Sequence, residues 1–546
     1  MSPGSAKRVI AFCVCERLDV AVIYRLILCA AIVIVVSELA LADAPPKPDK
    51  SKPNVTISKK TTRVTGPLTR DGYVDYAGAI NERTGKGVTP KNNANVLFWR
   101  AVGPHPGRAT MEPRYFELMG MQAPAERGRY FLGLDEYLQK VLPDTAARKQ
   151  LINEVNEELN QAMSRPWQAG EFPRIAQWLK ANEKPLSVLV EGTRRSRFYS
   201  PVVVPAEAKG LAEKTLFAVL LPFLQQSRGC ARALTARALL HAREGRTRAA
   251  WQDLSACHRL ARLIGQGPFL IDALVAYAVE SVAIEAELRF IQHTRPTAKD
   301  VAKYLGELAS WPPVASVAEK IEVSERFAFL DVTQMLARHG SSHLKELADL
   351  TGSDQPNPSV SRLTVSSIDW DTAMILGNRW YDRLVTALRK QDRRERQETL
   401  AGINAELEKL AKEVVKNRKP PKTRKAAGEL IGGILLSLLF GQVSAARLAE
   451  DEALQRERNL RVAFALSAYR DRRRVYPKSL DQLVPEFLAK VPGDLISGKS
   501  LVYRPSKGGY LFYSVGRNGK DDGGRSRSDK DKGDDLRVRM PVQDED

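Results

Sequence analysis

Apolar residues recur at spacings of three and four through most of the chain after residue 130, which is the pattern of amphipathic α-helices. The clearest region is 206–292, where for example Ala236, Leu239 and Leu240 share one helical face. Proline and glycine separate these stretches, because neither residue continues a helix well. The pattern predicts a mainly α fold. Helices are expected at residues 134–163, 172–183, 221–243, 247–264, 269–291, 318–339, 370–389 and 391–417.

The C-terminal block, residues 462–539, changes from helical spacing to short aromatic strands. A helix comes first, and an aromatic hairpin is expected at 501–515. Side chains alternate along a strand, so Tyr510 and Phe512 point one way and Tyr513 points the other. One of these faces must cover the apolar stripe of the helix, because a lone hairpin is only marginally stable in water. The block therefore predicts a small α+β domain.

This C-terminal order resembles the globular part of the type II secretion major pseudopilin. That family also has a helix ending in Tyr-Pro, as at Tyr476-Pro477, followed by a proline-bounded connector, an aromatic hairpin and a terminal Asp/Gly loop. The resemblance implies a chain that works outside the cytoplasm in a structural or adhesive role. An alternative that it also implies is a component of a type II secretion-like machine.

The paired helices at 221–243 and 247–264 resemble a tetratricopeptide unit, with Gly245 in the turn between them. The resemblance covers only residues around 228–265, and no second copy follows at a fixed period. We therefore expect a helical body that is repeat-like without being a repeat array.

The chain begins with a segment typical of export. Residues 1–42 contain a basic leader, an unbroken apolar run and the small residues Ala40-Leu41-Ala42 at cleavage spacing. We expect cleavage after Ala42, so that the mature chain begins at Asp43. The alternative is an uncleaved signal anchor that contacts the membrane through residues 20–42. Either form places the body in the periplasm or cell envelope.

A chain of 546 residues is too long for one core, so several domains are expected. Residues 43–64 are too rich in proline and lysine to bury much surface and are expected to act as a spacer. A basic, proline-containing stretch at 416–425 predicts a later boundary. The expected units are a signal peptide or anchor at 1–42, a linker at 43–64, a helical domain at 65–310, a second helical block at 311–425, and an apolar helix with the pseudopilin-like domain at 426–546.

The apolar run at 430–446 occupies the place of the helix that pseudopilins insert into the membrane and then pack in the filament. Its 17 residues are at the short limit for a membrane span. The basic stretch before it would also have to remain outside, against the positive-inside tendency. A buried packing helix is therefore expected, with a membrane or filament helix as the alternative.

The formal charge of +20 favours anionic partners. After export these are envelope proteins or anionic envelope polymers, and nucleic acid is not expected. The other interpretation is a solvated, highly charged helical surface. The two cysteines of the body, Cys230 and Cys257, are equidistant from the turn at 244–246. An oxidising compartment would permit a disulfide between them, and the alternative is two small buried residues.

The glycine-rich terminal loop is the candidate metal site. Carboxylates on a flexible loop suit Ca²⁺, which takes six to eight oxygen ligands, and major pseudopilins bind calcium in the corresponding loop. Basic residues inserted at 525–532 would partly neutralise the acids, so a solvated turn is the alternative. The candidate calcium ligands are Asp521, Asp522, Asp534 and Asp535.

No nucleophile elbow, phosphate loop, dinucleotide glycine pattern or zinc-type cysteine set occurs in the sequence. His339 and His343 have a spacing that suits metal ligands, but glycine and serines separate them and no third acidic ligand is evident, so surface or capping roles are expected. An enzyme is not the favoured interpretation. The alternative is an envelope hydrolase without a recognisable motif, which a perturbed carboxylate or histidine pair in a pocket would favour.

Overall fold

The computed structural model describes residues 53–108, 110–145, 147–205, 215–340, 360, 363–416, 419–439 and 443–542. The expected signal segment and His343 lie outside these residues. The fold is mainly helical, with 60% helix and 4% strand, and has a small three-stranded antiparallel sheet near the C-terminus. The mainly α prediction is therefore confirmed.

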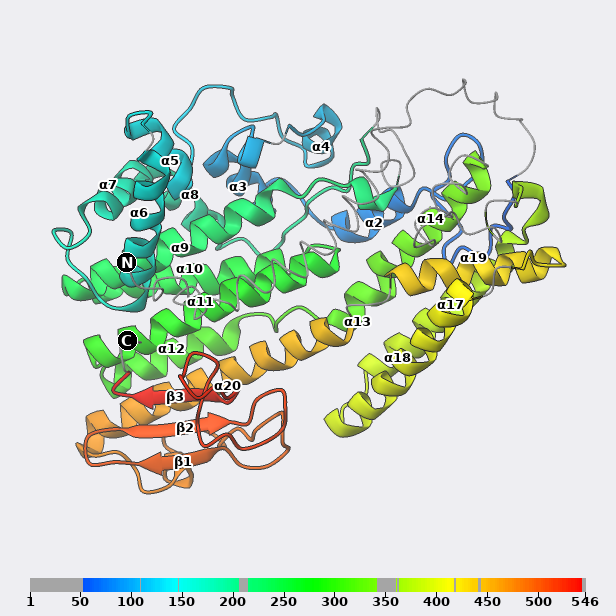
Figure 1. The fold of residues 1–546 in the computed structure, drawn as a ribbon. Helices are drawn as coiled ribbons and strands as arrows, with labels where there is room; N and C mark the ends of the chain where they lie inside the picture. The colour runs from blue at the N-terminus through cyan, green and yellow to red at the C-terminus, as the bar shows by residue number, and fades with distance from the viewer. Residues whose placement is uncertain are drawn as a thin grey trace, which may run out of the picture.

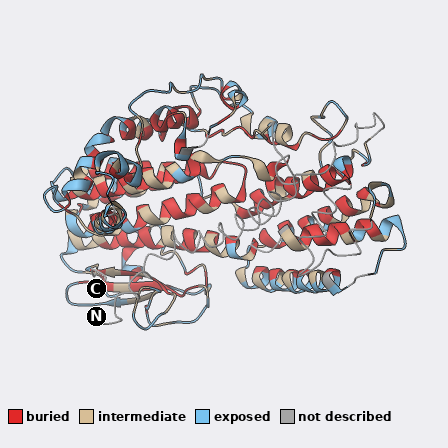
Figure 2. Cartoon of the chain, turned by 45° about the horizontal axis from the view of Figure 1, so that its top comes forward, coloured by how far each residue is buried: buried red, intermediate tan, exposed pale blue. Residues whose placement is uncertain are grey.

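The first apolar core lies within a layered helical bundle (Figure 1). Its long members α9, α10 and α11 pack on one another, and shorter helices cover them. Figure 2 shows the buried residues following the inner faces of these helices. The helices of this half are α3 (Ala94–Val102), α4 (Pro113–Leu118), α5 (Leu134–Val141), α6 (Arg148–Ser164), α7 (Pro173–Ala181), α8 (Glu183–Gly192), α9 (Pro222–Arg243), α10 (Thr247–Ile264), α11 (Leu270–Thr294) and α12 (Ala298–Ser310).

The second core is built mostly from later helices. A π-helical turn at Ile321–Glu325 joins two of them, so the helix expected at 318–339 is interrupted but present. Asp369 caps α17 by accepting from the Thr372 amide at 3.2 Å, because the first helical amides lack partners within the helix. The members are α2 (Tyr76–Gly85), α13 (Val317–Lys320), α14 (Arg326–His339), α17 (Trp370–Leu388), α18 (Arg393–Lys416) and α19 (Arg424–Leu439).

The C-terminal sheet packs on α20 (Val443–Arg473), with strands β1 (Val502–Pro505), β2 (Tyr510–Ser514) and β3 (Leu536–Met540) in that order. Tyr503, Phe512 and Val538 are opposite one another across the three strands. Phe512 and Tyr510 belong to the same core as Val462 and Leu466 of α20, which confirms the expected contact of helix and hairpin. The third strand was not expected from the sequence.

Helix α20 also packs on the helical body, on the side away from the sheet. The Phe464 ring lies 5.9 Å from Trp251 and 6.0 Å from Tyr304 between ring centroids. The amide of Ala298 at the start of α12 donates to Asp471 near the end of α20 at 2.9 Å. The expected C-terminal domain is therefore joined to the first core along its central helix.

Helices α18 and α19, which stand on either side of the domain boundary predicted near 425, pack against each other. Helix α19 packs on α17 and α18, whose core is the second one. A Cβ atom at Gly428 would clash with the carbonyl of Asp369, and one at Gly432 would lie 3.2 Å from the Ala373 backbone, so these glycines allow close approach of α17. The change from one core to the other falls within α20.

The N-terminal expectations also need correction. The part of the predicted linker that the structure describes is packed, since Val55 and Thr62 are buried and Asn378 donates to the Thr61 carbonyl at 2.7 Å. Helix α2 belongs to the second core and not to the first. The single helix expected at 134–163 is two helices, α5 and α6, because Pro143 cannot continue the first.

One helical stretch in the described part of the chain, Arg424–Arg473, is long and apolar enough to cross a membrane. In its most apolar window 64% of the residues are buried inside the protein. Ile431, Ile434 and Leu436 of the apolar run have exposures of 0%. This burial agrees with the expected packing helix.

The packing of α20 predicts the effect of removing its central ring. Phe464→Ala should lower the free energy of unfolding by about 3–5 kcal/mol, because the side chain is fully buried between two packed layers. Val475→Ala is the control, since that side chain is 61% exposed and should change stability by less than about 0.5 kcal/mol. Equal urea midpoints for the two variants would contradict the sandwiched position of Phe464.

Candidate functional site

The acidic loop between β2 and β3 folds across the face of the sheet that α20 leaves open. A Cβ atom at Gly524 would lie 3.0 Å from the Leu511 side chain and 3.1 Å from Tyr513. The Tyr513 hydroxyl donates to Asp521 at 2.9 Å, so this carboxylate fixes the loop to the sheet. Asp521 thus has a structural partner.

Three of the four predicted ligands come together. The carboxylates of Asp522, Asp534 and Asp535 each offer an oxygen, and these atoms lie within 4.8 Å of one another. Oδ2 of Asp535 accepts from the amides of Asp522 and Gly524 at 3.1 and 2.8 Å. Burial raises the pKa of Asp535, while hydrogen bonds, first from Asn518, lower the pKa of Asp522.

The donor set fits a hard cation. Oδ1 of Asp534 and Oδ1 of Asp535 are buried and have no hydrogen-bond partner. A Cβ atom at Gly516 would clash with Asp534, so glycine is needed beside this carboxylate. Orphaned carboxylate oxygens in a close-packed cradle are what an oxygen-seeking ion such as Ca²⁺ would satisfy.

The inserted arginines contact other groups. Arg525 donates to the Asp522 carbonyl at 2.7 Å rather than to a carboxylate of the cluster. Arg517 and Arg527 both reach Glu452 on α20, at 2.8 and 3.4 Å. These bases can therefore neutralise the acids only through longer-range electrostatic attraction, and not through direct ion pairs with the cluster. Arg527, together with Arg517 at the start of the loop, attaches the loop to α20 instead.

A second group of ionisable residues was missed by sequence reasoning. His258 of α10 is fully buried between Glu280 and Glu287 of α11. Its Nδ1 lies 2.9 Å from Glu280 Oε1, and its Nε2 lies 3.0 Å from Glu287 Oε2. Trp311 stacks on the imidazole with centroids 5.2 Å apart. The residue pattern that signals it is two glutamates seven positions apart, both buried, on a predominantly apolar helix.

The group extends to α20 through Arg262. This guanidinium donates to Glu280 at 3.0 Å and to Glu457 at 2.9 Å. Burial alone would lower the pKa of His258, but the two facing carboxylates raise it to about 10. Burial raises the pKa of Glu287, whereas His258 and Arg262 overcome burial and lower that of Glu280. The arrangement is an enclosed charge network that ties three helices together.

A hydroxyl–imidazole–carboxylate series occurs at the surface. Thr110 Oγ1 lies 3.2 Å from His105 Nδ1, and His105 Nε2 lies 2.9 Å from Glu126. Nucleophilic sites use this order of groups. Here the Glu126 side chain is 77% exposed and His105 is 43% exposed, so water competes for every contact. The geometry alone does not make a catalytic site.

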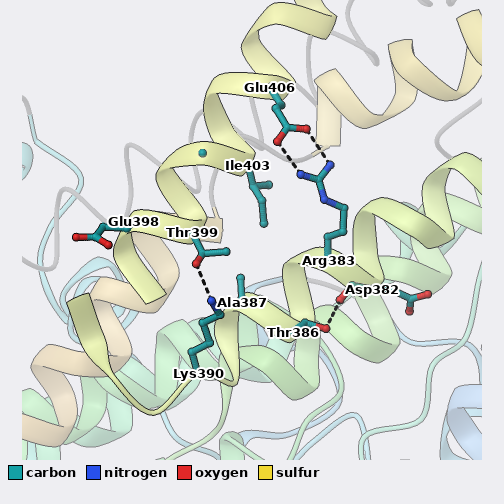
Figure 3. A pocket seen from close by; sticks show the side chains of 10 residues that line it. Asp382, Arg383, Thr386, Ala387, Lys390, Glu398, Thr399, Ile403 and Glu406 are labelled. Carbon is teal, nitrogen blue, oxygen red and sulfur yellow. Dashed lines mark hydrogen bonds and ion pairs between the residues drawn. The ribbon is translucent and has the colours of Figure 1, made fainter. Parts of the chain in front are cut away.

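An open groove of about 520 Å³ lies between α17 and α18 (Figure 3). Arg383 forms a bidentate pair with Glu406 at 2.9 and 2.7 Å across its rim. Lys390 donates to Thr399 at 2.9 Å at the other end. The charged side chains at its two ends are thus engaged with one another, which leaves an apolar floor that includes Ile403.

Cys230 and Cys257 lie on the facing helices α9 and α10, as predicted, and both are buried free thiols. The Cys257 thiol lies 3.8 Å from the carbonyl of Ala231, the neighbour of Cys230. Burial raises the pKa of both thiols, so neither is a ready nucleophile. The disulfide stays a prediction for the oxidised protein. His339 ends α14, and His343 lies outside the described residues, so the surface or capping roles expected for the two histidines stay predictions.

Comparison of the chain with protein-family models, with curated proteins and with solved structures gives no match. The functional argument therefore depends on the residues and their geometry.

The buried histidine predicts a specific dependence of stability on pH. The pKa of His258 is raised from its ordinary value near 6.5 to about 10 in the fold. Its contribution is complete below pH 6.5 and is lost as the pH rises to 10, so the free energy of unfolding should fall across that window. One proton limits the slope to about 1.4 kcal/mol per pH unit.

Urea unfolding of the parent, His258→Gln and His105→Gln proteins across this pH range tests the assignment. His105→Gln should keep the parent slope, because that ring is exposed. His258→Gln should be less stable near neutral pH and should lack this part of the slope. Parallel curves for the parent and His258→Gln would show that His258 is neutral in the fold.

Proposed function

We propose that this chain is an exported scaffold or binding protein of the cell envelope, with a pseudopilin-like C-terminal unit and a repeat-like helical body. One observation carries the proposal: α20 belongs to both cores and also supports the sheet. A single helix shared in this way holds the two cores and the sheet in fixed positions relative to one another, as a scaffold requires. The amino-terminal leader pattern supports export.

The rival role in a secretion machine requires an apolar helix that is free to enter a membrane or a filament. Helix α19 instead packs against α17 through Gly428 and Gly432, and its apolar side chains are buried. The face of α20 opposite the sheet is likewise covered by the helical body. These contacts favour a self-contained scaffold over a filament subunit.

Calcium is the ion that we propose for the acidic loop, with Asp522, Asp534 and Asp535 as ligands. The two orphaned oxygens support this assignment, as does the resemblance of the loop. Bound Ca²⁺ would supply positive charge at the centre of three carboxylates. The chain's own contribution is to hold those carboxylates together and, through Arg517 and Arg527, to join the loop to Glu452.

Export predicts a processed chain in the envelope fraction. Amino-terminal sequencing of that protein should begin at Asp43, and Ala42→Phe should block processing because the cleavage position requires a small residue. An unprocessed start at Met1 in the membrane fraction would identify an anchor. Recovery of the parent chain from the cytosol would contradict export.

Calcium predicts a shift in thermal stability. A ligand at one hundred times its dissociation constant stabilises the folded state by about 2.7 kcal/mol, so calcium should raise the melting temperature and chelator should reverse the rise. Asp534→Asn should remove most of the effect. Asp531→Asn is the matched control, because Asp531 is exposed and outside the cluster.

Equal calcium shifts in the two variants would place the ion elsewhere. A parent protein whose melting temperature and titration heat are the same with calcium and with chelator would exclude the site.

A further inference from the structure

Exposed basic residues occur in three segments at the ends of long helices, and these helix ends lie at the left of the bundle in Figure 1. There the turn from α9 to α10, the turn from α11 to α12, and the end of α20 come together. We call this surface the basic end face and define it as residues 241–248, 292–300 and 470–474. It holds nine Lys or Arg residues and three Asp or Glu residues.

Contacts between the three segments show that they form one surface. The Ala298 amide of α12 donates to Asp471 of α20 at 2.9 Å. Helices α9 and α11 pack on each other, and both end at this side of the bundle (Figure 1). The face is therefore built from the ends of five helices.

The acidic side chains of the basic end face already have interaction partners within the fold. Glu244 pairs with Arg246. Asp471 accepts from the Ala298 amide, and Asp300 caps α12 by bonding Thr297 at 2.6 Å. Several cations, in contrast, make no side-chain hydrogen bond or ion pair with any part of the chain that the structure describes. They are Arg248, Arg295, Lys299 and Arg474, and all four are exposed.

Stabilisation of the helix ends explains only some of these charges. Cations at the C-termini of α9, α11 and α20 complement the helix dipoles. Arg248 and Lys299 are different, because they stand in the first turns of α10 and α12. A cation at a helix N-terminus opposes the dipole and costs stability. Helix α10 has neither a side-chain cap nor an acid in its first turn to compensate.

We propose that the basic end face docks on an anionic phospholipid surface. Guanidinium groups bind phosphate well because their planar donors match its oxygens, and the uncapped amides of α10 face the same anions. A face of separate helix ends is suited to a sheet of headgroups. Val475, which is 61% exposed, adjoins the arginines and offers an apolar contact.

The membrane partner rests on the proposed location in the envelope. Vesicle binding is measured with purified protein, so its failure and the failure of export are separate results.

The test compares the full-length parent with two triple variants of equal charge change. The patch triple is Arg248→Gln, Lys299→Gln and Arg474→Gln. The control triple is Lys91→Gln, Arg127→Gln and Lys412→Gln, which are exposed residues outside the basic end face. Vesicles of phosphatidylcholine mixed with phosphatidylglycerol, and of phosphatidylcholine alone, are sedimented with each protein. The partition coefficients give a ratio for each protein, and comparing the ratios of the three proteins cancels the contribution of the basic and apolar leader, since the leader is the same in all of them.

Each cation near such a surface contributes about fivefold in binding, so the patch triple should reduce the ratio by roughly a hundredfold. The control triple should change it little. The patch triple should melt no lower than the parent, because Arg248→Gln and Lys299→Gln remove cations from helix N-termini. This stability check separates loss of docking from loss of fold.

An unchanged ratio in the patch triple, or an equal loss in both triples, would overturn the proposal. A parent protein that shows no preference for phosphatidylglycerol, yet is retained by immobilised polyphosphate through the same residues, would replace the membrane with a soluble polyanion. A patch triple that melts well below the parent would show that the fold needs these charges.

Discussion

Residues 460–466 of α20 are buried almost without interruption, because the helix lies between the sheet and the helical body. A helix that is apolar around its whole circumference needs cover on every side. Neither partner can supply that cover alone. Three strands with one open face would leave Phe464 in water, and the body alone would expose the opposite stripe. The mutual dependence of sheet, α20 and body follows from this one helix.

The charges on α20 are placed to suit this burial. Glu457 contacts Arg262, Asp451 contacts Arg396 at 3.0 Å, and Glu452 contacts Arg517. Removing charges from water is costly, so a buried pair adds little net stability, but breaking one leaves an unpaired charge. These pairs therefore mainly fix the position of α20 along and around its own axis, because the helix cannot slide or rotate without losing all of them. The acidic loop shares this frame because Glu452 holds its arginines.

Helical periodicity predicted most of the long helices because the 3.6-residue repeat is a local property that can be read from consecutive residues. The local sequence says less about domain boundaries. Prolines and lysines mark turns of the chain, whereas a core is defined by contacts between distant segments. Thus Thr61 of the expected linker contacts α17, and the helices on either side of the basic stretch, α18 and α19, share one core. Three of the four predicted calcium ligands lie close together because they share a loop. His258 was not predicted, because its partners are 22 and 29 residues away on another helix.

Two groups in this chain occupy locally unfavourable positions, one as a buried imidazole and one as a cation at a helix N-terminus. Their surroundings show which of them has a structural role and which indicates a function. The buried imidazole of His258 has a carboxylate on each side and Trp311 above it, so the fold offsets its charge, while one oxygen of Glu280 and both oxygens of Glu287 make no hydrogen bond. Arg248 opposes the dipole of α10 and receives nothing in return from the described chain. A local cost that the fold compensates needs no further explanation. A cost that the described part of the chain does not offset points to a partner beyond those residues.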